Sequence, residues 1–233
     1  MLAMLAVVPL AAPPAGTEVD IGVGRGSYHF VGGCGGPHDY INYAATEGSI
    51  RHRTERGWTG AVQGAARVGS VVKSTSEEEM GFTEVHTGRR QDAFALAARV
   101  DFHGRYGGLE LGPVVGYLPR SDDSGGAFIF PSASGWLGRY GVVHAWASLF
   151  ADRTLSLNRI GGFGLGHASD SLRLSAGLAA SGGQDASLIL DSDFRVGGRF
   201  WLGGGVQLGE TRNTWGGMLR VGFALDPTPP GAK

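Results

Sequence analysis

Apolar and polar residues alternate with a period of two along most of this chain. Between residues 94 and 103 the even positions are apolar, whereas Arg99, Asp101 and His103 occupy odd positions. Successive side chains of a β-strand point to opposite faces, so the pattern places apolar and polar side chains on opposite faces of a sheet. No segment shows a capped amphipathic helical stripe, so almost no helix is predicted. The same alternation recurs in residues 58–73, 109–117, 172–180, 194–208 and 215–225.

The alternating segments predict an all-β domain of about twelve antiparallel strands, with ten or eight strands as alternatives. In the first half of the chain, long connections at 25–47 and 74–91 alternate with tight ones at 54–56 and 104–107. Several segments exceed the ~5–6 residues typical of strands in globular proteins. The predicted strands are residues 17–24, 48–54, 57–73, 92–103, 108–118, 127–137, 141–150, 154–166, 171–181, 186–192, 194–208 and 214–225.

Two architectures use alternation of this kind. In a soluble β-sandwich, the apolar faces of two sheets pack against each other. In a transmembrane β-barrel, the apolar face points outward to lipid and the polar face lines the interior. Long strands, connections that alternate in length, and aromatic residues near strand ends favour the barrel. The sequence therefore predicts an antiparallel up-and-down transmembrane β-barrel, with the sandwich as the alternative.

Composition and the character of the two terminal segments define the expected domain limits. Glycine supplies 42 of the 233 residues, well above the usual proportion of about 7%. The formal net charge of −1 gives no electrostatic reason to expect a nucleic-acid partner, and the single Cys34 excludes an internal disulfide framework. Residues 1–12 are apolar and uncharged, as in the core of a secretory signal. We expect a signal-peptide remnant at 1–16, a β-barrel at 17–225 and a Pro-rich tail at 226–233.

The last alternating segment, Trp215–Leu225, combines glycines with apolar residues of one parity. With the strands named above, it resembles bacterial outer-membrane β-barrels as a class, over roughly residues 17–225. Barrels of this class often close with an aromatic residue at the chain end, whereas here Asp226–Lys233 follows. The resemblance implies a place in the bacterial outer membrane, in contact with its lipids and lipopolysaccharide. We expect no cofactor.

The polar face of the predicted strands gives the candidate functional residues. Arginines outnumber acids there, since only Asp20, Asp101 and Glu110 are expected to oppose them. Rings of arginine favour anions in a pore, so the sequence predicts a narrow, anion-leaning passive channel for small anions. A structural envelope barrel is the alternative, because small barrels are often filled by their own side chains. The predicted lumen-lining residues are Arg67, Arg99, Asp101, His103, Glu110, His144, Arg173, Arg195, Arg199 and Arg220.

Familiar catalytic and metal-binding motifs are absent from the sequence, so neither a catalytic nor a metal site is expected. His167-Ala168-Ser169 is similar to the His-x-Ser pairing of outer-membrane lipid A deacylases, although Asp170 follows where those enzymes usually have asparagine. Gly166 and Asp170 also favour a turn at this point. A barrel enzyme acting on lipid is therefore a minor alternative, beside a secreted or periplasmic β-sandwich used for binding or adhesion.

Overall fold

The computed structural model describes residues 15–31, 38–54, 58–77, 81–90, 92–103, 106–119, 125–138, 143–149, 159–181, 184–210 and 214–225. Within these stretches no helix is long and apolar enough to cross a bilayer. The Pro-rich tail and the expected signal segment, apart from Ala15 and Gly16, lie outside the described residues. The strands are β1 (Gly16–Val31), β2 (His38–Arg53), β3 (Trp58–Glu77), β4 (Gly81–Arg90), β5 (Ala93–His103), β6 (Gly107–Pro119), β7 (Gly125–Gly138), β8 (Val143–Leu149), β9 (Arg159–Ala168), β10 (Leu172–Ser181), β11 (Gln184–Arg195), β12 (Phe200–Gly209) and β13 (Trp215–Ala224).

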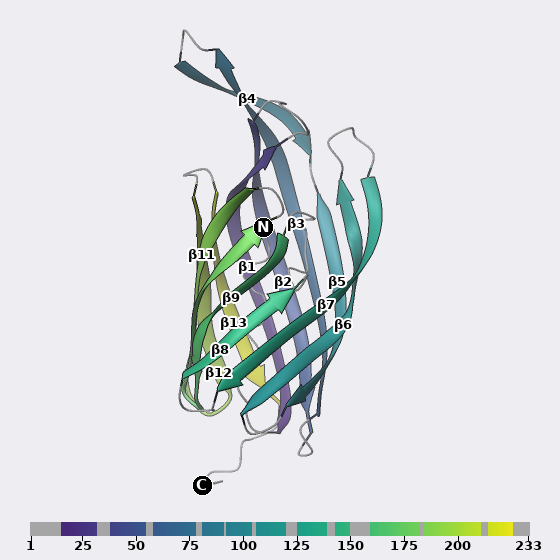
Figure 1. Cartoon of the computed structure of the whole chain (residues 1–233), viewed down its shortest axis with the longest axis vertical. Helices are drawn as coiled ribbons and strands as arrows, with labels where there is room; N and C mark the ends of the chain where they lie inside the picture. Colours follow the sequence, from purple (N-terminus) through teal and green to yellow (C-terminus); the bar gives the residue numbers. More distant parts are fainter. Residues whose placement is uncertain are drawn as a thin grey trace.

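Twelve of these strands form one closed antiparallel sheet (Figure 1). Each strand of the ring pairs with its neighbours in the chain, and β1 pairs with β13 from Glu18↔Ala224 to Ser27↔Trp215. The predicted up-and-down barrel of twelve strands is therefore confirmed. A sandwich of two sheets is excluded, because a single sheet curls round and closes on itself.

The remaining strand, β4, extends beyond the ring. It pairs with the last part of β3, from Ser70↔Arg90 to Glu77↔Gly81, whereas β5 pairs with the first part of β3. β4 and β5 thus follow one another along the same partner, and the β3–β4 hairpin projects from one end of the barrel (Figure 1). The sequence predicted a loop at 74–91, which was wrong. The residues there are mostly polar and show no apolar alternation, whereas the β3–β4 pairing depends on backbone hydrogen bonds.

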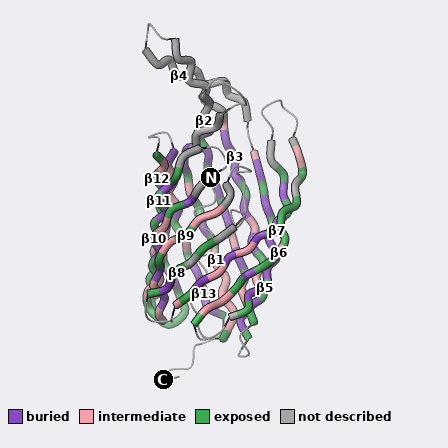
Figure 2. Tube along the Cα trace, in the orientation of Figure 1, coloured by how far each residue is buried: buried purple, intermediate pink, exposed green. Residues whose placement is uncertain are grey.

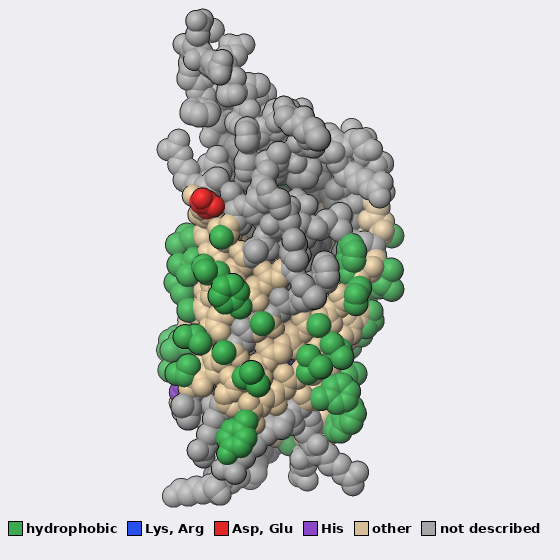
Figure 3. All heavy atoms as spheres, viewed as in Figure 1, with side chains coloured by type: hydrophobic (Ala, Val, Ile, Leu, Met, Phe, Trp, Pro, Cys, Tyr) green, Lys and Arg blue, Asp and Glu red, His purple; other side chains and the backbone are tan. Residues whose placement is uncertain are grey.

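The wall of the barrel has an apolar outer surface. Leu219 is 71% exposed and Val221 is 49% exposed, although both lie in the middle of a fully paired strand. Buried and exposed residues alternate along the strands in Figure 2, and hydrophobic side chains spread over the face seen in Figure 3. Large apolar side chains are exposed on every strand of the ring, so the hydrophobic face of the sheet points outward. This surface is what a barrel needs in contact with lipid.

Aromatic side chains mark both edges of the apolar surface. Toward the end with the tight turns, Trp58 lies 4.2 Å from Phe102 and Phe200 lies 4.9 Å from Phe223, measured between ring centroids. Toward the other end, the rings of Phe94 and Tyr117 stack at 6.1 Å. Phe94 and Phe102 stand eight positions apart on β5. At ~3.3 Å per residue and a tilt of ~40°, this separation spans a height of roughly 20 Å, close to the hydrophobic band of outer-membrane barrels.

Strand boundaries differ from the sequence prediction most at two connections. β1 continues to Val31 and β2 begins at His38, whereas the sequence placed a long loop at 25–47. The outward positions of β2 include Asn42 and Thr46, and inward ones include Ile41 and Tyr43, so the usual polarity is mixed and the strand is hard to recognise. The second boundary concerns the turn between β11 and β12, which falls at 196–199 with Gly197 at φ +80°, not near Asp193.

A charged residue at the middle of the outer surface is expected to destabilise the barrel. Leu219 lies midway between Trp215 and Phe223 on β13, so Leu219→Arg should lower the free energy of unfolding by about 2–4 kcal/mol in phospholipid vesicles. Leu225→Arg, beyond the end of the same strand, is the matched control and should cost only about 0–1 kcal/mol. Denaturant unfolding followed by tryptophan fluorescence measures both. Equal losses at the two positions would contradict an outward apolar band.

Candidate functional site

The interior of the barrel carries all but one of the charged strand residues whose side chains are described; the exception, Arg25 on β1, is exposed. Within the part of the chain whose side chains are described, seven arginines and seven acids occupy inward positions on the strands. The arginines are Arg51, Arg53, Arg67, Arg99, Arg173, Arg195 and Arg220, and the acids are Glu18, Asp20, Glu47, Asp101, Glu110, Asp191 and Asp193. The arginine excess expected from the sequence is therefore not found among these residues.

The first group of interior charges, the β2–β6 cluster, comprises Arg53, Thr59, Arg99, Asp101 and Glu110. Arg99 Nη1 donates to Glu110 Oε1 at 2.5 Å, and Arg53 Nη2 lies 3.7 Å from Asp101 Oδ2. Arg53 Nε also donates to Thr59 Oγ1 at 3.1 Å. All five side chains are buried, so opposite charges compensate each other where water is scarce.

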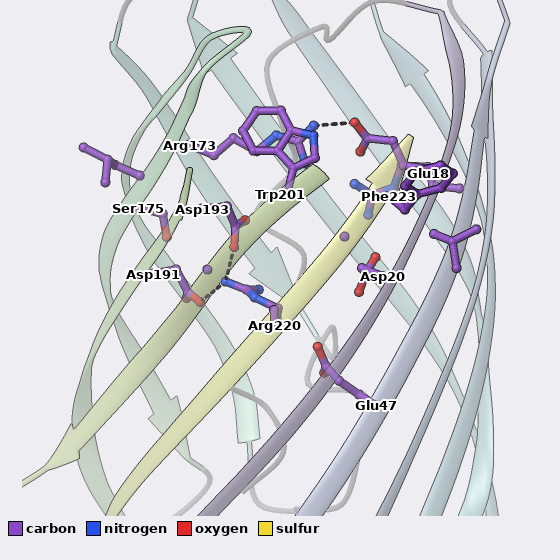
Figure 4. Close-up of a pocket in the computed structure, with 15 residues that line it drawn as sticks. Glu18, Asp20, Glu47, Arg173, Ser175, Asp191, Asp193, Trp201, Arg220 and Phe223 are labelled. Carbon is purple, nitrogen blue, oxygen red and sulfur yellow. Dashed lines mark hydrogen bonds and ion pairs between the residues drawn. The ribbon is translucent and has the colours of Figure 1, made fainter. Parts of the chain in front are cut away.

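A second group, the β10–β13 cluster, comprises Arg173, Asp191, Asp193, Trp201 and Arg220. The Arg220 Nη2 atom lies 2.7 Å from Asp191 Oδ1 and 3.2 Å from Asp193 Oδ1, so one guanidinium joins β13 to two carboxylates of β11. The guanidinium of Arg173 stands 3.9 Å from the centre of the Trp201 ring, within the range of a cation–π contact. These side chains converge on one cavity (Figure 4). The volume of this cavity is about 80 Å³.

One ion pair of this region bridges distant strands. Arg173 Nη2 on β10 donates to Glu18 Oε1 on β1 at 2.5 Å (Figure 4). In the ring, β11, β12 and β13 lie between these two strands. The pair therefore runs as a chord across the interior rather than along the wall, and it narrows the interior at that level.

Glycines of the wall make room for the charged side chains. A Cβ atom at Gly203 would collide with Asp193 Oδ1 and with the Ser192 carbonyl oxygen, and one at Gly205 would collide with Asp191 Oδ1. Gly22 on β1 faces the aliphatic part of Arg220, whose Cγ would lie 3.1 Å from an added Cβ. Part of the high glycine content thus has a steric cause, because carboxylates and guanidiniums occupy the space of the missing side chains.

Most of the predicted lumen-lining residues point into the interior, but not all. His144 is 1% exposed and packs edge-on against Trp136, with ring centroids 6.4 Å apart. Arg67 is buried, with its guanidinium 6.0 Å from the centre of the Tyr43 ring. Arg195, the last residue of β11, has inward parity and donates to the Asp170 carbonyl oxygen at 3.3 Å at the rim of the barrel. The His103 side chain lies outside the described residues.

The placement of Arg199 in the lumen is wrong. Arg199 is exposed and lies in the turn between β11 and β12, so the alternation that connects it to Arg195 in the sequence is interrupted. The sequence also placed a strand boundary at residue 193, between the predicted strands 186–192 and 194–208. It therefore missed Asp191 and Asp193 as interior residues, although both face Arg220. Glu18 and Glu47 were also missed, although both share the parity of inward residues on their own strands.

Ser169 has a structural place in the turn between β9 and β10. Its Oγ donates to the Leu172 carbonyl oxygen at 3.1 Å, and the Leu172 amide donates back to Ser169 Oγ at 3.2 Å. His167 has outward parity on β9 and is half-buried. The serine hydroxyl proton is thus directed to the backbone, and the turn predicted from Gly166 and Asp170 is confirmed.

No protein-family model matches the chain, and no curated protein matches it either. Among solved structures, the translocator domain of the autotransporter NalP from Neisseria meningitidis is similar, with a TM-score of 0.63, 15% identity, and coverage of 94% of this chain and 92% of that one. The outer-membrane phospholipase A from Escherichia coli gives a TM-score of 0.45 at 11% identity, covering 97% of this chain and 98% of that one. The Pseudomonas putida toluene transporter TodX gives 0.42 at 8% identity, covering 96% and 92%. The similarity to NalP shows that this chain has the fold of an outer-membrane β-barrel.

Filling the space of one interior glycine is expected to disturb the β10–β13 cluster. Gly203→Val should displace the Asp193 carboxylate and lower the free energy of unfolding by roughly 1–3 kcal/mol, the usual cost of overpacking. Gly217→Val is the control, because an added Cβ at Gly217 meets no atom within 4 Å. Thermal unfolding, read as the change in unheated gel mobility, compares the two. A loss of the same size for Gly217→Val would remove the steric explanation of Gly203.

Proposed function

We propose that this barrel lies in a bacterial outer membrane and acts as a narrow passive channel for small polar solutes. One observation carries the proposal: a closed ring with an apolar outer surface encloses paired charges and a cavity of about 80 Å³. Such an interior offers water and polar solutes a favourable environment across the hydrocarbon layer. On the outside, the apolar surface and its aromatic edges would contact membrane lipids and lipopolysaccharide.

The charge balance bears on selectivity. Selectivity by charge needs an excess of one sign along the passage. The inward strand residues with described side chains include Glu18, Glu47, Asp191 and Asp193, which offset the arginines that favoured an anion-leaning channel. The geometry therefore supports a passage without strong overall anion preference.

A structural envelope barrel is the second candidate, and a specific observation favours it. Gln207 is 0% exposed and His144 is 1% exposed, so solvent does not reach these two inward side chains. The chord from Arg173 to Glu18 also narrows the interior. Such filling is common in small barrels and would leave no continuous aqueous path.

Conductance in planar lipid bilayers distinguishes the two functions. We expect small single-channel steps from the wild-type barrel and a reversal potential near zero across a potassium chloride gradient. The double variant Glu18→Ala/Arg173→Ala should conduct severalfold better, because the chord that narrows the passage is gone.

The control is Arg99→Ala/Glu110→Ala, which removes an ion pair between the adjacent strands β5 and β6. Its conductance should stay closer to that of the wild type. If neither the wild type nor Glu18→Ala/Arg173→Ala gives steps, the channel is refuted and the structural barrel remains.

A further inference from the structure

The cavity of the β10–β13 cluster has a local surplus of acids. Five carboxylates line it, against three guanidinium groups. The acids are Glu18, Asp20, Glu47, Asp191 and Asp193, and the arginines are Arg51, Arg173 and Arg220. The remaining four of the seven inward arginines lie outside this cavity wall, so the interior is balanced as a whole but acidic at this point.

The ion pairs inside the cavity do not remove this surplus. Arg173 pairs with Glu18, and Arg220 is shared between Asp191 and Asp193. Asp20 accepts a hydrogen bond from Ser49 Oγ, which is a neutral donor. Because carboxylates outnumber guanidinium groups in this enclosed space, the cavity attracts positive charge.

Buried polar atoms of the wall without a hydrogen-bond partner among the described residues include two oxygens that can accept, Asp191 Oδ2 and Ser175 Oγ. They also include two nitrogens that can only donate, Trp201 Nε1 and Arg220 Nε. The side chain of Asp191 is 8% exposed, and Ser175 and Trp201 are 7% and 6% exposed. Buried polar groups are nearly always hydrogen-bonded, so these atoms indicate a hydrogen-bonding occupant of the cavity.

We propose that this cavity binds a small organic cation whose N–H groups donate hydrogen bonds, such as a guanidinium or primary ammonium group. Asp191 Oδ2 and Ser175 Oγ accept from the cation, and the Glu18, Asp20 and Glu47 carboxylates supply the surrounding negative charge. Anions are disfavoured here by the same surplus. The idea that this cation is the solute of the channel rests on the proposed function. Binding of the cation to the cavity does not require conduction.

Tryptophan fluorescence of the purified barrel in detergent measures binding, because Trp201 forms part of the cavity wall. The probe is guanidinium chloride at non-denaturing millimolar concentrations. Tetramethylammonium chloride at equal ionic strength is the matched cation without N–H donors. We expect a saturable change with guanidinium and none with tetramethylammonium. The Trp201→Phe variant should lose the response.

Two variants locate the bound cation. Asp191→Asn should weaken guanidinium binding by about tenfold or more, as expected when a hydrogen bond between charged groups is lost. Ser175→Ala removes an acceptor without breaking an ion pair and should weaken binding severalfold. Ser187→Ala, a buried serine on β11 outside the cavity wall, is the control and should bind as the wild type does. Unheated gel mobility verifies that each variant is folded.

Each outcome separates the binding site from the channel. Saturable binding without conductance steps supports the site and refutes the channel. Conductance steps without saturable guanidinium binding overturn the site and leave the channel standing. An equal response to tetramethylammonium, or unchanged binding in the folded Ser175→Ala variant, also overturns the inference.

Discussion

The ring depends on mutual pairing of backbone amide and carbonyl groups. A strand in hydrocarbon has no water to satisfy its peptide groups, and an open sheet edge would leave a whole row of them without partners. Here the register between β1 and β13 closes the last gap with ten residue pairs. Once that condition is met, side chains are free to face lipid on one side and one another on the other, and the remaining features follow from this division.

Inside the ring, the ion pairs and the glycines that leave room for them depend on each other. The acids and arginines would be costly if they stood alone in a narrow interior, and they compensate each other in two clusters. Ion pairs of this size need room, and glycines such as Gly203 and Gly205 supply it on the adjacent strand. Glycine normally weakens a strand. In this barrel the stability lost at a glycine is offset, because an ion-paired side chain of the neighbouring strand packs against the glycine.

The sequence predicted the barrel, the outward apolar face and the approximate strand number, because period-two alternation is a local property of each segment. It failed where that property is obscured. The mixed faces of β2 hid Glu47 among small residues, and the polar β3–β4 hairpin looked like a loop. Pairing between distant strands was beyond its reach: nothing local connects Glu18 to Arg173, which lie 155 positions apart. The position of one turn decided whether Asp191 and Asp193 faced a partner or solvent, and with them the sign of the local charge.

Strict alternation also limits how this chain can change its length. A single residue inserted at the start of β13 would reverse the orientation of every position beyond it, turning Arg220 toward the acyl chains and Leu219 into the interior. Insertions and deletions should therefore be tolerated in the turns and in the hairpin that projects past the ring, where neither side of the chain has to face lipid. Related sequences should accordingly vary in length at the rims while each wall segment keeps its residue count.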